Sequence, residues 1–323
     1  MKIAIVGCGA VGSYYGARLA MAGHEVHFLL RTDFNHVKEN GVWIRSIDGD
    51  FHVRPIAANN PTQIGIVDVI LIALKSTANH CFKELLTPLT GPDSLLVTLQ
   101  NGLGNEEQLA AIFGPGNILG GLCFVCLNRI APGIIRHTAH GRIVLGEYTR
   151  KPQKRTLDLA VLFNQAGIPC SIAEDMGQAH WEKLIWNIPF NGLGVAGVAG
   201  YEAVISGSMQ IGVSPGPTLP TDSLLNSTQW YPLIQELMQE VISTARMLGY
   251  SIDYQLADEN IRRTRIMGAY KASTLLDFEK GLELEIDSLF LEPLRQAQKV
   301  GAKVPRLAAL CQVLLGLQKS KSK

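Results

Sequence analysis

The sequence lacks a hydrophobic run long enough to cross a bilayer, because its apolar stretches end well short of about 20 residues. It also lacks the pattern of a secretory signal, since only four apolar residues follow Met1-Lys2 before the first glycine. The chain also lacks an excess of positive or negative charge, because 29 basic and 28 acidic residues give a net charge of +1. Neither a membrane nor a nucleic acid is therefore an expected partner. We expect a soluble chain that binds a small molecule.

Cysteine is scarce and does not indicate a metal site. The six cysteines are Cys8, Cys81, Cys123, Cys126, Cys170 and Cys311, and most lie in apolar runs, where a free thiol acts as a small hydrophobe. Cys123 and Cys126 have the spacing of a redox pair, but residues 118–127 are predicted to form a buried strand, in which the two side chains point to opposite faces. No second pair with metal-ligand spacing accompanies them. We expect no metal and a reducing, cytoplasmic location.

What the chain does have is apolar material for two hydrophobic cores, with 323 residues of which 47% are hydrophobic. Strand and helix patterns alternate through its first half, whereas only helical patterns follow Glu174. Alternating strands and helices are typical of a doubly wound, mostly parallel sheet. We therefore predict an α/β Rossmann domain that binds NADP(H) at residues 1–174. An all-α substrate and catalytic domain is predicted at residues 175–323.

Some stretches carry turn and loop signals instead. Asp48-Gly49 lies between two short strand patterns, at residues 42–47 and 51–54, which predicts a hairpin. Ser206–Leu225 is rich in glycine, serine and proline and predicts a mobile surface loop. The basic tail Lys319–Lys323 predicts a frayed end.

A glycine-rich motif lies between the first predicted strand and the first predicted helix. It consists of Gly7, Cys8, Gly9, Ala10, Val11 and Gly12. In this position the motif is typical of dinucleotide binding, whereas alone it would indicate only a glycine turn. Gly7 permits the tight turn, Gly9 lets the backbone approach a pyrophosphate, and Gly12 allows close packing of helix on strand. The pyrophosphate would meet the N–H groups of the helix N-terminus.

The end of the second predicted strand lacks the acidic residue with which NAD enzymes usually bind the ribose 2′-hydroxyl. Arg31 stands there, about twenty residues after the glycines. Its guanidinium offers a planar fork of donors for a 2′-phosphate. Asp33 could instead accept a ribose hydroxyl, and Arg31 could be an ordinary solvated side chain. We favour NADP(H) as the cofactor.

Polar residues follow two later strands at the predicted carboxyl edge of the sheet, where such folds bind ligands. Lys75 follows the strand pattern at residues 67–73, and Asn101-Gly102 follows the one at residues 95–99. Either could be an ordinary loop residue, because Asn-Gly is a common turn pair. Their shared position at successive strand ends makes both candidates for the site.

Lys183, Asn187 and Asn191 recur every four residues, so they share one face if the predicted helix is continuous. Their neighbours are mostly apolar, and a lysine that loses hydration has a lowered pKa, which suits proton donation. A lysine that extends to solvent beside two polar surface residues is the alternative. Pro189 is predicted to kink the helix.

Nearer the C-terminus, periodicity indicates only a solvated helix cap for Ser273, Asp277, Glu283 and Glu285.

Taken in order along the chain, these motifs resemble the ketopantoate reductase family. The resemblance is carried by Gly7–Gly12, Arg31, Lys75, Gln100-Asn101-Gly102, Trp181-Glu182-Lys183-Leu184, Asn187, Asn191 and the stretch from Ser273 to Glu285. It implies that NADPH reduces 2-dehydropantoate to pantoate, a step toward pantothenate. It also implies a homodimer.

The resemblance assigns roles to individual residues. Lys183 would be the general acid that protonates the C2 oxygen, and Glu285 would hydrogen-bond the substrate and help to orient that centre. The substrate would be held by Asn101, Asn187, Asn191 and Ser273. The cofactor would be held by Gly7–Gly12, Arg31, Lys75, Asn101 and Glu285.

The sequence departs from the family pattern near the implied substrate site. Tyr201 stands where family members often have a further substrate-binding asparagine, and Ser206–Leu225 is longer than expected. An unusually flexible stretch is predicted by Gly192, Gly194, Gly197 and Gly200. One alternative is therefore a reductase of another small 2-oxo acid on the same fold. Another is a non-catalytic NADP(H) sensor, which the presence of both Lys183 and Glu285 disfavours.

Overall fold

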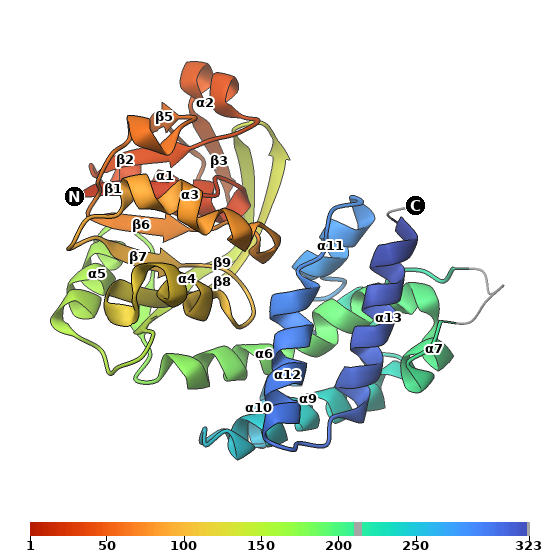
Figure 1. Cartoon of the computed structure of the whole chain (residues 1–323). Coiled ribbons are helices and arrows are strands. Elements are labelled where there is room, and N and C mark those ends of the chain that lie inside the picture. The colour runs from red at the N-terminus through yellow and green to blue at the C-terminus, as the bar shows by residue number, and fades with distance from the viewer. Residues whose placement is uncertain (210–214, 322–323) are drawn as a thin grey trace. The chain divides into compact units, whose positions relative to one another are not determined.

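The computed structural model describes residues 1–209 and 215–321, and the chain divides into two compact units, Met1–Met176 and Gly177–Lys323 (Figure 1). The first unit contains a sheet with helices on both faces, and the described part of the second is helical. This confirms the predicted fold class. Part of the predicted loop, residues 210–214, and the last two residues of the predicted frayed tail lie outside the described residues.

All residues of the first unit are described, and its strands form one ten-stranded sheet. The strands are β1 (Lys2–Val6), β2 (Glu25–Leu29), β3 (Val42–Ser46), β4 (Phe51–Val53), β5 (Ile56–Ala58), β6 (Val69–Ile72), β7 (Leu95–Thr98), β8 (Ile118–Ala131), β9 (Ile134–Glu147) and β10 (Cys170–Ile172). Their order is β4-β3-β9-β8-β7-β6-β1-β2-β5, and β10 pairs with β9. The pairs β3–β4 and β8–β9 are antiparallel, whereas the other neighbours are parallel.

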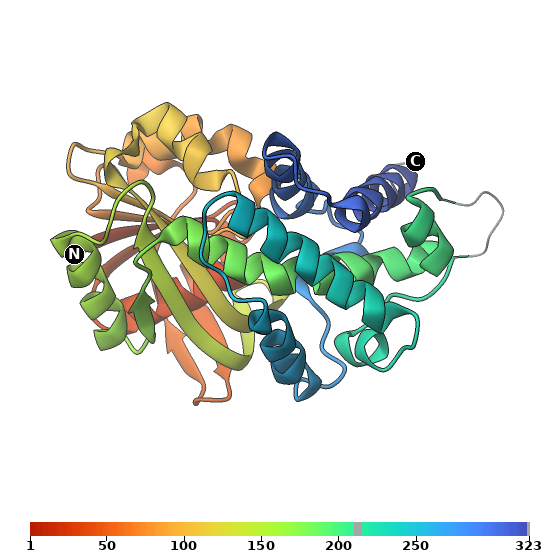
Figure 2. The same ribbon diagram turned by 90° about the horizontal axis from the view of Figure 1, so that it is seen from below.

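Two separate hydrophobic cores cover the two faces of this sheet, because successive strand side chains point to opposite sides. In β1, Ile3 and Ile5 enter one core and Ala4 and Val6 enter the other, all fully buried. The first core includes side chains of α1 (Ala10–Met21) and α5 (Lys154–Gln165). The second includes those of α3 (Phe82–Leu86) and α4 (Asn105–Phe113), which run along one face of the sheet in Figure 2. Burial of each Ile or Leu contributes about 1.5–3 kcal/mol.

Two hairpins complete the first unit. The predicted hairpin is confirmed, since β3 pairs with β4 and Gly49 in the turn has a φ of +105°. The longer β8–β9 hairpin has register shifts on either side of Val125 and Cys126, and both Cys123 and Cys126 lie on β8 as free thiols. The helix α2 (Phe34–Asn40) connects β2 to β3.

The helices of the second unit are α6 (Met176–Ala196), α7 (Tyr201–Ser206), α8 (Thr221–Leu225), α9 (Trp230–Met247), α10 (Gln255–Arg265), α11 (Ser273–Glu279), α12 (Glu292–Lys299) and α13 (Pro305–Lys321). The first residue of α6, Met176, is the last residue of the first unit. A 3₁₀ turn, η5 (Gly197–Ala199), follows α6, and a π-helical segment, η6 (Asp287–Leu291), precedes α12. The helix α9 packs against α8, α10 and α13. Within residues 1–209 and 215–321, no helix has the length and apolar character that a bilayer crossing needs.

The predicted surface loop is wrong for its C-terminal part. Residues 221–225 form α8, which begins directly after Pro220, a residue compatible with a helix start. The segment before it is held to the end of α6 and to η5 by backbone bonds, in which the N–H groups of Leu219 and Gly216 donate to the carbonyls of Gly194 (2.9 Å) and Val198 (2.8 Å). The predicted frayed tail is also wrong up to residue 321, because α13 continues to that point.

The predicted flexibility of the glycines after Asn191 is wrong as well. Gly192 and Gly194 lie inside α6, and a Cβ on Gly192 would lie 2.6 Å from the side chain of Leu310 on α13. A Cβ on Gly194 would lie 3.1 Å from the carbonyl oxygen of Leu219. Close packing therefore requires Gly192 and Gly194 at the end of α6, whereas Gly200, which has a φ of +88° and open space at its Cβ position, serves the turn before α7.

Candidate active site

The glycine motif connects β1 to α1, and the structure explains why glycine stands at each of its three glycine positions. Gly7 has a φ of +98°, and a Cβ there would lie 2.3 Å from the backbone nitrogen of Leu74. A Cβ on Gly12 would lie 2.3 Å from the carbonyl oxygen of Gly7. Gly9 differs, because apart from Gly9 itself and the two residues beside it, no atom of the described chain lies within 4 Å of the point where its Cβ would stand. Its backbone is therefore accessible to a ligand, as close approach of a pyrophosphate requires.

The N-terminus of α1 suits an anion. Gly9 is the N-cap residue, no side chain caps this terminus, and no acidic residue lies in the first turn. The first N–H groups of a helix lack intrahelical acceptors and carry the positive end of the helix dipole. Ala10 and Val11 pack against the first hydrophobic core and so fix the direction of the helix. A phosphate group would bind here without a charged side chain.

Cys8 has a structural place in this loop. Its thiol donates to the carbonyl oxygen of Ile5 (3.4 Å). Burial raises the pKa of the thiol well above its usual value, and the negative charge of Asp33 adds to the rise. The thiol therefore stays protonated, which makes it a poor nucleophile.

Beyond the end of β2, Arg31 is exposed and Asp33 is buried. The Asp33 carboxylate accepts hydrogen bonds from the guanidinium of Arg129, the hydroxyl of Thr32 (3.2 Å) and the N–H of Gly133 (3.3 Å). Arg129 lies near the end of β8, 96 residues away along the chain. Sequence reasoning missed this ion pair, since nothing near either residue indicates the other.

Lys75 and Asn101 lie on neighbouring loops, because each follows one of the adjacent parallel strands β6 and β7. Lys75 is the N-cap residue of the 3₁₀ helix η2 (Ser76–Cys81). Asn101 begins a turn in which Gly102 and Gly104 have φ values of +86° and +88°. Both side chains are partly buried.

Four buried polar side chains connect these two loops. The hydroxyl of Thr98 donates to Gln100 Oε1 (2.9 Å), and Gln100 Nε2 donates to Asn79 Oδ1 (2.7 Å). Asn79 Nδ2 then donates to Asn105 Oδ1 (3.0 Å), and Asn105 Nδ2 donates to the carbonyl of Asn101 (3.1 Å). We call these four residues the amide chain. Sequence reasoning noted Gln100 only as part of a turn and missed Asn79 and Asn105.

In the helical unit, α6 runs unbroken past Pro189, so Lys183, Asn187 and Asn191 share one face of it. The two asparagines are buried, with exposed fractions of 7% and 2%, and Lys183 is half-buried. Apolar neighbours on the helix, including Trp181 and Leu184, are buried. Whether Pro189 kinks the helix stays a prediction.

Ser273, predicted as a third substrate-binding residue of this unit, lies against Asn191. The hydroxyl of Ser273 and the N–H of Thr274 both donate to Asn191 Oδ1, at 3.2 and 3.0 Å. Asn191 Nδ2 is 3.4 Å from Asn187 Oδ1. The structure thus brings together three predicted site residues from α6 and α11, two of which are 82 positions apart in sequence.

Glu285 is half-buried and lies just before the π-helical segment η6. The backbone carbonyl of Glu285 accepts the N–H of Leu289, which belongs to η6 (3.2 Å). Segments of π-helix are rare and frequent at functional sites. Tyr201, which departs from the family pattern, packs edge-to-face on Trp230, with the ring centroids 5.4 Å apart. Its ring is thereby part of the packing between α7 and α9.

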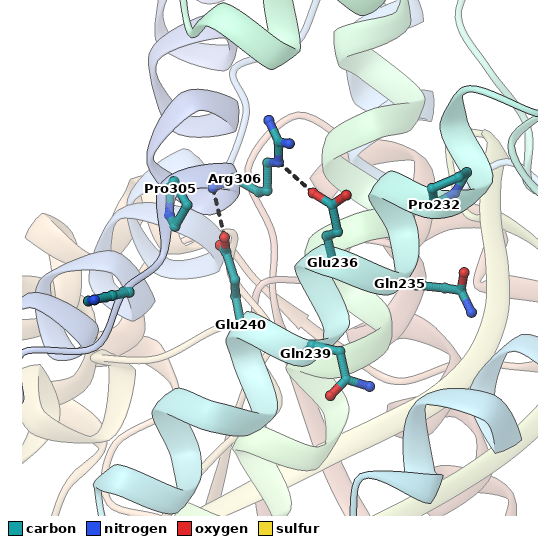
Figure 3. Close-up of a pocket in the computed structure, with 8 residues that line it drawn as sticks. Pro232, Gln235, Glu236, Gln239, Glu240, Pro305 and Arg306 are labelled. Carbon is teal, nitrogen blue, oxygen red and sulfur yellow. Dashed lines mark hydrogen bonds and ion pairs between the residues drawn. The ribbon is translucent and has the colours of Figure 1, made fainter.

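An open hollow on the second unit contains none of the predicted site residues (Figure 3). It is lined by Pro232, Gln235, Glu236, Gln239, Glu240, Lys303, Pro305 and Arg306. Both carboxylates are used to hold α13: Glu240 accepts the N–H groups of Arg306 (2.8 Å) and Leu307 (2.9 Å), and Glu236 pairs with the Arg306 side chain (2.5 Å). Burial raises the pKa of Glu240, although these backbone bonds oppose the rise. This hollow is explained by helix anchoring.

Comparisons with known proteins match both units to one family. Residues 3–150 match the family model described as ketopantoate reductase PanE/ApbA, and residues 218–318 match the model of its C-terminal part. The chain is 36% identical over 315 residues to the 2-dehydropantoate 2-reductase of Nostoc sp., covering 96% of this chain and 92% of that protein.

Solved structures agree with this match. The crystal structure of 2-dehydropantoate 2-reductase from Geobacter metallireducens is similar with a TM-score of 0.88 and 39% identity, and the match covers 98% of this chain and 99% of that one. D-mandelate dehydrogenase in complex with NADH has the same fold at 19% identity, with a TM-score of 0.82 and coverage of 99% of each chain. The chain therefore belongs to the ketopantoate reductase PanE/ApbA family and is an oxidoreductase of the 2-dehydropantoate 2-reductase type.

Proposed function

We propose that this chain reduces 2-dehydropantoate to pantoate with NADPH, a step toward pantothenate. Relatives with 36% and 39% identity that carry the name 2-dehydropantoate 2-reductase match nearly the whole chain. The observation that carries the proposal is the hydrogen-bonded cluster of Asn187, Asn191 and Ser273 beside Lys183 on α6. This cluster of α6 and α11 joins hydrogen-bonding groups for the substrate to a candidate proton donor, Lys183, on α6.

The residues of the first unit fit a dinucleotide. The open backbone at Gly9 and the uncapped N-terminus of α1 suit a pyrophosphate. Arg31 is exposed and offers two parallel N–H donors to a 2′-phosphate. Asp33 is already bound by Arg129, which supports NADPH over NADH. When bound, the nicotinamide supplies the hydride.

The chain itself supplies the proton and the orientation. Reduction adds a hydride to C2 of the 2-oxo acid and a proton to its oxygen, so the substrate gains two electrons and becomes a 2-hydroxy acid. In our proposal Lys183 donates that proton, and Glu285 hydrogen-bonds the substrate and helps to orient the reacting centre. Asn187, Asn191 and Ser273 hold the hydroxyl and carboxylate. Lys75 and Asn101 contact the cofactor beside the substrate.

A second candidate is a reductase of another small 2-oxo acid. It is favoured by Tyr201, which packs on Trp230 where family members often have a substrate-binding asparagine. The same fold also binds anilino(oxo)acetate in D-mandelate dehydrogenase, at 18% identity. We further propose a homodimer that acts in the cytoplasm, on the basis of the family resemblance alone.

One assay tests the proposed reaction. NADPH absorbance is followed with 2-dehydropantoate and with a panel of other 2-oxo acids, with the Lys183→Ala variant as the control for enzyme-dependent turnover. We expect the highest kcat/KM with 2-dehydropantoate. A higher kcat/KM with another acid would select the second candidate, and no turnover with any acid would contradict both.

A further inference from the structure

Asp33 lies at the edge of the sheet where nucleotide choice is made. The strands β1 and β2 pair in parallel with Val6 opposite Leu29, so the glycine motif and residues 30–33 leave the sheet at the same edge. The negative charge of Asp33 also adds to the raised pKa of the Cys8 thiol in the glycine motif, after the larger effect of burial. In such sheets an acidic residue in this region accepts the ribose 2′-hydroxyl of NAD.

The carboxylate of Asp33 is engaged by the chain itself. It accepts three hydrogen bonds, from Arg129, Thr32 and Gly133, and its side chain is only 9% exposed. Arg129 and Gly133 both belong to the β8–β9 hairpin, the long pair of yellow-green strands in Figure 1. A charge-assisted bond is roughly twice as strong as a neutral one. Oδ1 already accepts two bonds and Oδ2 one, so a ribose hydroxyl would compete for this carboxylate with donors that the chain itself holds in place.

Arg129 also changes the charge that a nucleotide meets. Its side chain is 41% exposed, while its guanidinium donates to Asp33. A bare carboxylate would repel a 2′-phosphate, whereas the ion pair has no net charge. Arg31, also exposed, then provides the positive charge of this region without opposition from Asp33.

We propose that Arg129 is a specificity-determining residue, which favours NADPH over NADH by holding the Asp33 carboxylate away from the ribose 2′-hydroxyl. This inference rests on the proposed use of NADPH. It assigns the choice of nucleotide to a residue of the β8–β9 hairpin in addition to Arg31, and it explains why an aspartate near the end of β2 is compatible with a 2′-phosphate.

The test measures nucleotide affinity and needs no substrate. Dissociation constants of NADPH and NADH are obtained from nicotinamide fluorescence for the wild type and Arg129→Ala. We expect the preference for NADPH, the ratio of the two constants, to fall at least tenfold in Arg129→Ala, which corresponds to about 1.4 kcal/mol. Arg129→Lys keeps a positive donor for Asp33 and should retain most of the preference.

Three further variants separate this role from a structural one. Arg136→Ala removes an exposed arginine of the same hairpin and should leave the ratio unchanged. Arg129→Ala combined with Asp33→Asn removes the released charge and should restore weak NADH binding. Arg129→Gln, which retains a neutral donor, should show a smaller fall in the same direction and serves if Arg129→Ala does not fold.

The outcomes distinguish the two proposals. If the wild type prefers NADPH and neither Arg129→Ala nor Arg129→Gln changes the ratio, the role of Arg129 is wrong and the proposed cofactor stands. If Arg136→Ala lowers the ratio as much as Arg129→Ala does, the nucleotide preference depends on the structure of the β8–β9 hairpin and not on the ion pair of Arg129 with Asp33. If the wild type binds NADH more tightly than NADPH, the proposed cofactor itself is wrong.

Discussion

Replacement of Asn79 by alanine should destabilise the first unit more than the loss of one small side chain suggests. Asn79 is 7% exposed, and its amide accepts a bond from Gln100 Nε2 and donates one to Asn105 Oδ1. Both partners are buried, with exposed fractions of 4% and 1%. An unsatisfied buried polar group costs about 1–3 kcal/mol, so two of them give an upper range of about 2–6 kcal/mol. A water molecule can enter such a polar cavity, and we therefore expect a loss of about 2–4 kcal/mol.

Urea unfolding, followed by circular dichroism, measures this loss. Asn40→Ala is the matched control, because Asn40 is exposed and its side chain makes one bond, to the carbonyl of His36 (3.1 Å). Its free energy of unfolding should change by no more than about 0.5 kcal/mol. If Asn79→Ala unfolds at the same urea concentration as Asn40→Ala, the amide chain does not stabilise the unit, and our account of it is refuted.

The same variant should also lower turnover. The amide chain ends at the carbonyl of Asn101, and Asn79 lies within η2, which begins directly after Lys75. Loss of the connection frees the two loops to move independently. Displacement of a positioning group by about 1 Å can lower a rate by up to 10²-fold. A normal kcat in folded Asn79→Ala would mean that Lys75 and Asn101 are positioned by other contacts.

Three other variants test the proposed site and the stability of the sheet. Lys183→Ala should lower kcat by roughly 10²–10⁴-fold if Lys183 is the general acid, and unchanged turnover would dismiss that role. Arg31→Ala should weaken NADPH binding by about 1.5–3 kcal/mol and spare NADH, as measured by fluorescence titration; equal losses would place the 2′-phosphate elsewhere. Burial alone would raise the pKa of Glu147, but bonds from Arg155 and Thr156 outweigh it and hold this pKa below its usual 4.5. The stability from these bonds is present above that value and is lost as pH falls through the lowered pKa, so thermal unfolding of Glu147→Gln should depend less on pH over this acidic range than that of the wild type.

Features encoded by neighbouring residues could be predicted from the sequence. The glycine motif depends on conformations and contacts within one strand–turn–helix unit, and the Asp48-Gly49 turn depends on a positive φ at a single residue. The helical face of Lys183, Asn187 and Asn191 follows from a spacing of four residues. Each signal lies within a few positions of the structure that it predicts.

Features that depend on distant partners could not be predicted from one sequence. Asn191 and Ser273 are separated by 82 positions, and Asp33 and Arg129 by 96. The glycines of α6 were misinterpreted for the same reason: a flexible loop and a tight helix contact both favour glycine, and only the position of Leu310 distinguishes them. Proline-rich residues before α8 likewise indicated a loop, although proline also precedes helices.

The direction of the hydrogen bonds at Asn191 limits what the substrate can be. Its Oδ1 already accepts from the Ser273 hydroxyl and the Thr274 N–H, so both lone pairs of that oxygen are used. Any bond from Asn191 to a substrate must therefore come from Nδ2, which can only donate. Donors bind the carboxylate, carbonyl and hydroxyl oxygens of a 2-oxo acid, whereas an ammonium group would find no acceptor at this residue. The Asn191 side chain thus favours an acceptor oxygen of a ligand, whereas Ser273 Oγ, which donates its proton to Asn191, can only accept a hydrogen bond.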